Sequence, residues 1–262
     1  MIKFFRHIRQ NLLMENQTSK YFKYAIGEII LVVIGILIAL QINNWNEKRK
    51  ESKQETTILK SLKNDIQSDL KDLNFEIDFK KKMIIKYANC LDILTDKKEG
   101  TKADFFRDFK SILQIGGLTL NVTTFNNLQN NGELKLITNK SLADSIVGYY
   151  NTDYQGWETA LRDYTRNNFA PYLLEFDYVP PHDIELIEPQ LQAFLEQFSE
   201  NIVDYKKAQQ PLEAYKNNYM IINMLRYKSR NILGLLAAYT RQKEYAINLN
   251  NSIDDYLKKI ND

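Results

Sequence analysis

The residues able to do chemistry are few in this sequence. It has two histidines, His7 and His182, and a single cysteine, Cys90. A protein zinc site takes about four Cys, His or carboxylate ligands, and a nucleophilic centre needs a base beside the nucleophile. His182 stands alone beside two prolines, which is typical of a solvated loop residue. The sequence therefore predicts no metal site and no histidine-dependent catalytic centre.

Two acidic pairs, Glu185/Glu188 and Asp254/Asp255, come closest to a general acid and base. The sequence contains no P-loop, no GxGxxG or GxSxG motif and no HExxH helix to accompany them. Polar helices and loops produce such pairs by composition alone, and no neighbouring group suggests a shifted pKa. We therefore predict no catalytic residue and no bound cofactor, and we expect a protein that is not an enzyme.

Arg226 and Arg230 are one helical turn apart on an otherwise apolar stretch. Two guanidinium groups at this spacing are able to clamp a carboxylate or a phosphate. The alternative is an ion pair with an acidic side chain on a facing helix, and the sequence favours this second interpretation.

The composition is that of a folded protein with long helices. Apolar residues make up 44% and charged residues 26% of the 262 residues, which argues against general disorder. The net charge of +2 gives no broad cationic field, so nucleic acid is not an expected partner. Only nine glycines and five prolines are present, so the chain has few turns.

One stretch, Ile29–Leu40, has no polar side chain on any face. Twelve residues make about 18 Å of helix, too short to cross a bilayer, but aromatic residues flank the run. Tyr21 and Tyr24 precede it and Trp45 follows it, and Tyr24 to Trp45 is about 31 Å of helix, close to the thickness of a hydrocarbon core. We predict a transmembrane helix over residues 20–46 with these three residues as interface anchors.

Two other interpretations of this stretch remain open. One is a buried helix of a soluble core, and the other is a cleaved signal peptide. The signal peptide is disfavoured because bulky residues follow at Ile38–Ile42, where a cleavage site needs small ones. We expect an uncleaved anchor, preceded by a basic tail over residues 1–19 and followed by a helical extramembrane domain over residues 47–262. The tail is either a short helix in the membrane interface or a frayed end.

The basic residues around the span favour an N-terminus in the cytoplasm and a C-terminal domain outside the cytoplasmic (inner) membrane. Positive charge is retained on the cytoplasmic side, and long C-terminal domains are translocated largely regardless of their charge. Five basic residues precede the span and four follow it closely: Lys3, Arg6, Arg9, Lys20 and Lys23 before, and Lys48, Arg49, Lys50 and Lys53 after.

Two features inside the span could be functional. Gly27, Gly35 and Ala39 lie on one helix face, where small side chains let two helices approach closely and form a homo-oligomer. The alternative is that Gly and Ala are simply common in spans. Glu28 lies one turn inside the level of Tyr24, where a carboxylate is costly unless it snorkels to the interface or finds a partner; we favour snorkelling.

The segment Lys20–Lys50, KYFKYAIGEIILVVIGILIALQINNWNEKRK, resembles the N-terminal signature of a family of uncharacterised bacterial single-pass membrane proteins. A second stretch, Thr123–Tyr150, is similar to the same family, and the two cover about a quarter of the chain. The resemblance implies a membrane protein of unknown function. It brings no catalytic residues.

After the span, no proline or glycine occurs before Gly100, which predicts that the span continues into a long stalk helix. Residues 80–82, all lysines, interrupt its apolar stripe, so packing against helices of the same chain is favoured over a two-stranded coiled coil. The stripe repeats every eleven residues, which predicts a nearly straight helix: Leu59 and Leu70, Leu62 and Leu73, Ile66 and Ile77.

We expect an all-α fold in which this stalk packs with a long C-terminal helix over residues 212–260 and several short helices as a bundle. Asn131-Gly132 should supply left-handed geometry after one short helix, and Thr138 or Asn139 should cap the next. The expected short helices cover residues 104–115, 122–129, 139–150, 157–169 (ending before Pro171) and part of 187–202.

The function expected from these features is that of a membrane-anchored helical module. Its partners would be the lipid bilayer and an unidentified protein, or it would sense something outside the cytoplasm. The alternative is a small-ligand binder or enzyme that uses a pocket within the bundle.

Overall fold

The computed structural model describes residues 18–114, 116–177 and 210–261, and these are almost entirely helical, with no strand among them. The predicted all-α class is therefore confirmed. The chain forms two compact units, residues 1–58 and residues 59–262. The predicted helix within 187–202 lies outside the described residues, as do the N-terminal tail, His182, Glu185 and Glu188.

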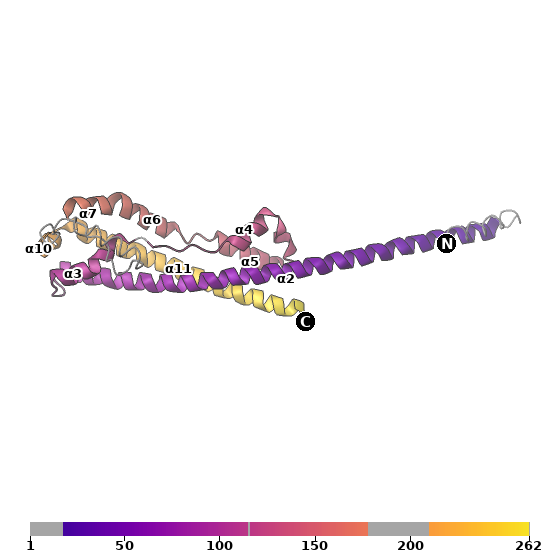
Figure 1. Ribbon diagram of the computed structural model, residues 1–262, viewed down its shortest axis with the longest axis horizontal. Coiled ribbons are helices and arrows are strands. Elements are labelled where there is room, and N and C mark those ends of the chain that lie inside the picture. Colours follow the sequence, from indigo (N-terminus) through magenta and orange to yellow (C-terminus); the bar gives the residue numbers. More distant parts are fainter. Residues whose placement is uncertain (1–17, 115, 178–209, 262) are drawn as a thin grey trace, which may run out of the picture. The chain divides into compact units, whose positions relative to one another are not determined.

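A single helix, α2, extends from Thr18 to Leu94 (Figure 1). The first proline of the sequence is Pro171, so no residue in α2 lacks its backbone N–H group. The two glycines of α2 are Gly27 and Gly35, and the helix passes through both. The prediction that the apolar stretch continues into a long second helix is confirmed.

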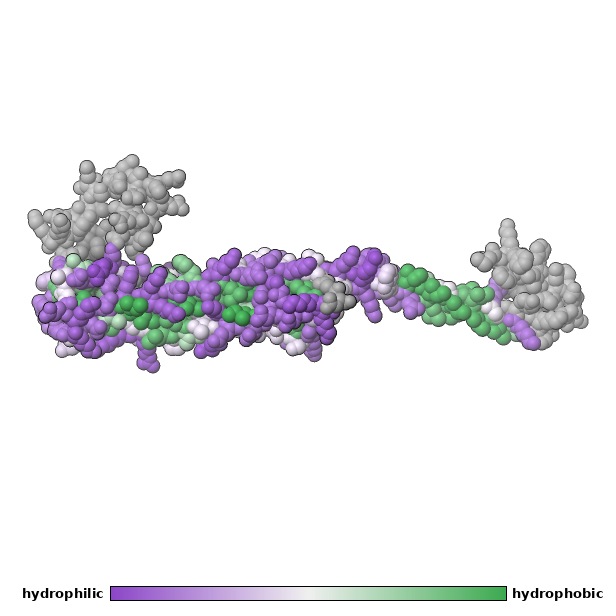
Figure 2. All heavy atoms as spheres, turned by 90° about the horizontal axis from the view of Figure 1, so that it is seen from below, coloured by the Kyte–Doolittle hydropathy of each residue, from purple (hydrophilic) through white to green (hydrophobic). Residues whose placement is uncertain are grey.

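In the first unit, the apolar side chains of α2 face outward. Among residues 29–42, the large apolar side chains are 46–64% exposed, and Figure 2 shows them as a continuous green surface. A core helix of a soluble domain would bury these side chains against its own chain. The described residues thus include one helical stretch that is long and apolar enough to cross a membrane, and its apolar surface is uncovered.

In the second unit, buried positions recur every seven residues along α2, and five of the six residues in the predicted eleven-residue pairs are buried as well. Leu70 is only partly buried, whereas Lys80 is buried within the stripe that it was expected to interrupt. A seven-residue repeat is the geometry of helices that wrap around each other. The buried positions at this spacing are Leu59, Ile66, Leu73, Lys80, Tyr87 and Leu94.

The C-terminal helix α11, Tyr219–Asn261, has the same repeat and packs with α2 (Figure 1). It contacts α5 and α6 as well. Asn217 and Asn218 separate α11 from the short helix α10, so the single helix expected from residue 212 is interrupted. Two overlapping sets of buried residues form its seam: Leu225, Ile232, Tyr239, Ala246 and Ile253, and Ile221, Lys228, Leu235, Gln242 and Leu249.

Short helices cover this pair. The predicted helix signals are confirmed at Gly132, which has a φ of 65°, and at Asn139, whose side chain accepts a hydrogen bond from the N–H of Leu142. The short elements are α3 (Lys102–Phe109), η1 (Lys110–Leu113), α4 (Thr123–Asn130), η2 (Glu133–Leu136), α5 (Lys140–Asn151), α6 (Gly156–Tyr164), η3 (Thr165–Phe169), α7 (Ala170–Phe176) and α10 (Leu212–Lys216).

The prediction that helix 157–169 ends before Pro171 is wrong, because helical structure continues through this residue into α7. The turn before it, η3, is a π-helical turn. Pro171 occupies the first turn of α7, where a missing N–H costs little. A wide turn followed by a helix start therefore replaces the expected break.

Four large tyrosine side chains are buried in the core of the second unit. Tyrosines in helical bundles commonly keep a hydroxyl in water, but Tyr87, Tyr149, Tyr215 and Tyr239 are at most 1% exposed. Each hydroxyl forms a hydrogen bond within the chain. The core of the second unit is thus built from polar as well as apolar groups.

Candidate functional site

The most unusual feature of the second unit is the extended segment, residues 116–122, which lies between helices and pairs with no strand. Backbone polar groups buried away from water need partners. Side chains from α2, α6 and α11 and from the short connection before α6 supply them. We call these side chains the polar seam: Asp65, Asp69, Lys80, Tyr154, Gln155, Glu158 and Tyr239.

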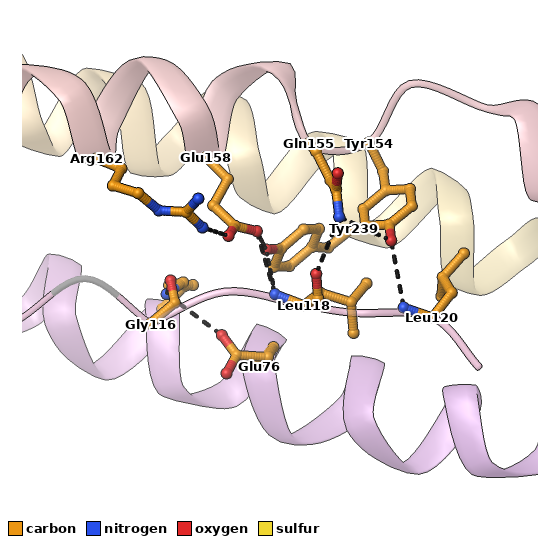
Figure 3. A network of polar contacts seen from close by, with 10 residues as sticks. Glu76, Gly116, Leu118, Leu120, Tyr154, Gln155, Glu158, Arg162 and Tyr239 are labelled. Atoms are coloured by element: carbon orange, nitrogen blue, oxygen red, sulfur yellow. Dashed lines mark hydrogen bonds and ion pairs between the residues drawn. The ribbon is translucent and has the colours of Figure 1, made fainter. Parts of the chain in front are cut away.

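Glu158 of α6 is at the centre of the polar seam (Figure 3). Its Oε2 atom accepts hydrogen bonds from the backbone N–H of Leu118 at 3.1 Å and from the hydroxyl of Tyr239 at 2.8 Å. Its Oε1 atom forms an ion pair with Arg162, one helical turn further along α6. The carboxylate is 4% exposed, so these bonds replace the water that it loses. The hydroxyl of Tyr239 also lies 3.0 Å from the N–H of Leu118.

The close approach of Glu158 requires Gly117. A Cβ atom at Gly117 would lie 1.8 Å from Oε1 of Glu158. The carboxylate is held from three sides, so it has little freedom to move away. The glycine is therefore needed for the approach of a charged side chain, since its φ is not in the left-handed region.

Lys80 and Tyr154 hold the segment on either side of Leu118, and Figure 3 shows the contact of Tyr154 with Leu120. Nζ of Lys80 donates to the carbonyl oxygen of Gly116 at 2.7 Å and lies 3.2 Å from the carboxylate of Glu76. The hydroxyl of Tyr154 accepts from the N–H of Leu120 at 3.2 Å. Lys80 is 1% exposed, and these contacts explain how a lysine is accommodated in the core.

Two aspartates of α2 bind the end of the extended segment and the start of α4. Oδ1 of Asp69 accepts from the N–H of Asn121 at 2.7 Å, and Oδ2 accepts from the hydroxyl of Tyr149 at 2.8 Å. Asp65 accepts from the side chain of Asn121 at 3.0 Å and from the N–H of Thr124 at 3.1 Å. A carboxylate at the first turn of α4 caps that helix from another element.

Burial raises the pKa of the Asp69 carboxyl, and the hydrogen bonds from Asn121 and Tyr149 oppose this effect. The side chain is fully buried. Because desolvation is the largest influence, the folded form holds a proton to a higher pH than an exposed aspartate does. The bonds to the extended segment are therefore made by a carboxylate whose charged form is disfavoured by its surroundings.

The polar seam attaches the extended segment to the surrounding helices. Its acceptors and donors are engaged with the backbone of the extended segment or with each other. Among the described residues, no group of His, Cys, Asp and Glu side chains is arranged to hold a metal ion. The side chains of the polar seam bind the backbone of the extended segment, as the backbone of a neighbouring strand would in a sheet.

The residues predicted for the membrane segment belong to the first unit. Cβ atoms placed at Gly27 and Gly35 would have no neighbour within 4 Å, and Ala39 is exposed. The indole of Trp45 is 62% exposed, and the guanidinium of Arg49 lies 5.3 Å from its ring centre. Glu28 is half-buried. The side chains of Tyr21 and Tyr24 lie outside the described ones, and no observation tests the roles assigned to these residues.

The arginines of α11 do not form the expected ion pair. Arg226 and Arg230 are both exposed, and no acidic side chain of the described part of the chain lies within ion-pair distance of either. The alternation of burial along α11 places them on its solvent-exposed face. Asp254 instead forms an ion pair with Lys63 of α2.

Comparison with known proteins identifies a family for part of the chain. Residues 28–154, just under half of the chain, match the model of a family of unknown function (DUF6090). The resemblance to an uncharacterised family is confirmed. The match runs from the apolar stretch of α2 through Tyr154, and so includes the extended segment. No curated protein and no solved structure matches the chain.

The structure shows what holds the second family-like stretch, Thr123–Tyr150, in place. Phe125 stacks on Tyr150 with ring centres 4.5 Å apart, and the start of α4 is bound by Asp65. Both ends of this stretch are thus attached to each other or to α2. The part of the polar seam contributed by α6 and α11, including Glu158, lies beyond the matched residues.

Proposed function

We propose that this protein is a membrane-anchored helical module, held in the cytoplasmic membrane by the first half of α2. One observation carries the proposal: the large apolar side chains of residues 29–42 are 46–64% exposed. Exposing apolar surface to water is unfavourable by roughly 25 cal/mol for each Å². A bilayer removes that cost along the whole circumference of a helix.

The flanking residues support the same proposal. Trp45 is an exposed aromatic residue at the end of the apolar stretch, with Arg49 over its ring. Amphipathic aromatic and basic side chains of this kind are stable at the level of lipid headgroups. Gln41, Asn43 and Asn44 are the polar residues that precede Trp45, so the polarity rises toward this interface.

We further propose that the N-terminus lies in the cytoplasm and residues 59–262 lie outside it, because five basic residues precede the span and four follow it. A C-terminal fusion to alkaline phosphatase, which is active outside the cytoplasm, should be active. The same fusion to a fluorescent protein that matures only in the cytoplasm should be dark. The reverse pair of results would contradict the orientation and leave the anchor itself intact.

The extramembrane unit, in our proposal, binds a protein partner or senses a condition outside the cytoplasm. In support, buried apolar side chains form one cluster in its core and the polar seam is engaged within the chain, which suits a module that presents a surface. Crosslinking in native membranes, followed by purification of the full chain, should yield one defined adduct. The adduct should disappear when residues 59–262 are replaced by an unrelated soluble domain on the same anchor.

The membrane segment is also proposed to pair with a second copy through Gly27, Gly35 and Ala39. Gly35→Ile should reduce the crosslinked dimer of the full chain in bilayers, because the branched side chain keeps the helices apart. Leu37→Ile, on the same helix and of unchanged volume, is the matched control. Equal dimer yields for the two variants would contradict pairing through this face.

A further inference from the structure

Lys228 is a fully buried lysine in the N-terminal part of α11. Its Nζ donates a hydrogen bond to the carbonyl oxygen of Ile112 in η1. The rings of Tyr87 and Phe169 lie 5.9 Å and 5.8 Å from Nζ. The amine is therefore enclosed by α2, η1 and η3 as well as by its own helix.

No acidic side chain in the described part of the chain forms an ion pair with Lys228. The charge of Lys80, which has the same sign, also acts on it and lowers its pKa. Lys80 itself is compensated by Glu76 at 3.2 Å and by the carbonyl oxygen of Gly116. Lys228 thus differs from Lys80 in that, among the described residues, its polar contact is with a neutral carbonyl group.

The other titratable groups around Lys228 are engaged elsewhere. The hydroxyl of Tyr87 lies 3.3 Å from the carbonyl oxygen of Ser111, and burial raises its pKa far above neutrality. Asp108, next to η1, is bound by Asn89 at 3.3 Å and lies 3.8 Å from the guanidinium of Arg107. On the side of α6, Glu158 is bound by Tyr239 and Arg162. None of these groups provides a counter-charge to the amine.

We propose that Lys228 is a pH-sensitive latch: its neutral amine closes the core, and protonation opens the bundle locally at η1 so that water reaches Nζ. Burying an unpaired ammonium group is strongly unfavourable, so the proton is taken up together with opening. η1 is the weakest cover, because it has four residues and no helix follows it directly, whereas η3 has a helix at each end and α2 and α11 are long helices.

The direction of the pH dependence follows from the burial. Desolvation, with a smaller contribution from Lys80, lowers the pKa of Lys228 from 10.5 to about 7. Between these two values the open form binds more protons than the closed form, so closing becomes more favourable as the pH rises. Proton uptake is therefore coupled to opening above about pH 7, and the dependence weakens at lower pH, where the closed form begins to bind the proton as well. From pH 7 to pH 9 the opening equilibrium constant should fall about 50-fold.

Hydrogen exchange of the full chain in lipid nanodiscs tests the latch. In peptides that contain residues 110–113, the opening equilibrium constant should fall about 50-fold from pH 7 to pH 9, after correction for the intrinsic exchange rate. Lys228→Met should remove the dependence, since methionine fills a similar volume without a titratable group. Lys258→Met, at an exposed position of the same helix, should keep it. Cys90 does not interfere, because burial raises the pKa of its thiol to about 12.

An opening constant of wild-type η1 that is the same at pH 7 and pH 9 would overturn the proposal, whether or not Lys228→Met folds. A dependence that persists in a folded Lys228→Met protein would overturn it equally. The inference rests on the contacts of the second unit alone. A failure of the membrane proposal in topology or fractionation experiments therefore leaves this test unaffected.

Discussion

The two parts of α2 invert the usual relation between polarity and burial in opposite ways. In the first unit, apolar side chains cover the surface of the helix, and in the second unit aspartate and lysine are buried in the core. Leu37 is 57% exposed, whereas Asp69 is fully buried. Neither arrangement is stable in water without a partner: the first needs an apolar medium, and the second needs hydrogen bonds.

The difference shows where the partners come from. For Asp69 and Lys80, the partners are backbone groups of the extended segment, and they belong to the same chain. For the apolar stretch around Leu37, the described residues supply no cover. The buried polar groups therefore explain how the second unit holds itself together, and the exposed apolar groups point to something beyond the chain.

The largest expected effect comes from charging the exposed apolar surface. Val33→Arg combined with Leu37→Arg should cost roughly 5–7 kcal/mol of membrane insertion, at about 2.5–3.5 kcal/mol for each arginine near a helix centre. The variant should move from the membrane fraction to the soluble or aggregated fraction after alkaline extraction. A control pair, Ser52→Arg with Thr57→Arg, alters exposed positions beyond the span and should leave the fractionation unchanged.

The next largest effect is a difference between the two units when the same substitution, leucine to alanine, is made in each. Leu62→Ala removes a fully buried side chain and should lower the free energy of unfolding of the second unit by about 2–5 kcal/mol. Leu37→Ala removes the same atoms from an exposed position and should leave that free energy unchanged. Denaturant unfolding of the detergent-solubilised chain, followed by circular dichroism, measures both. Similar losses in the two variants would break the comparison.

A glycine pair gives a smaller contrast. Gly117→Ala forces the Glu158 carboxylate away from its partners and should cost about 1–3 kcal/mol in the same unfolding measurement. Gly35→Ala places its methyl group where nothing lies within 4 Å and should have no effect on the second unit. If Gly117→Ala is neutral, the tight approach of Glu158 to the extended segment does not contribute to stability.

The smallest effect is expected where polar groups are paired but partly exposed. Lys63 and Asp254 join α2 to α11, with side chains 27% and 33% exposed. Lys63→Met should change the free energy of unfolding by no more than about 1 kcal/mol, because water already solvates much of the pair. If Lys63→Met lowered the free energy of unfolding as much as Gly117→Ala does, burial would not determine how much a polar contact contributes to stability.

The fold class and the helix ends were predictable because they depend on local signals. Gly132 and Asn139 mark a helix end and a helix start through their own backbone and side-chain chemistry. The long helices follow from the absence of proline. Pro171 was misjudged because the π-helical turn before it depends on packing and not on a residue preference.

The polar seam was not predictable, because its residues look like surface residues in the sequence. Lys80 lies in a run of three lysines, and only its seven-residue spacing from Leu73 and Tyr87 indicates a core position. Glu158 gives no such signal, since its partners Leu118 and Tyr239 are distant in the chain. A search for charged residues within a seven-residue apolar repeat would have found Lys80 and Lys228, and would still have missed Glu158.

The central claim, that residues around 24–45 lie within a bilayer, is tested most directly by cysteine accessibility. The only native cysteine, Cys90, is buried, so single cysteines placed along residues 20–60 can be read individually. In intact membranes, a membrane-impermeant maleimide should label positions beyond Trp45 from outside, leave a window of about 20 residues unlabelled, and reach the positions before Tyr24 only after permeabilisation. Labelling at every position in intact membranes would contradict the account.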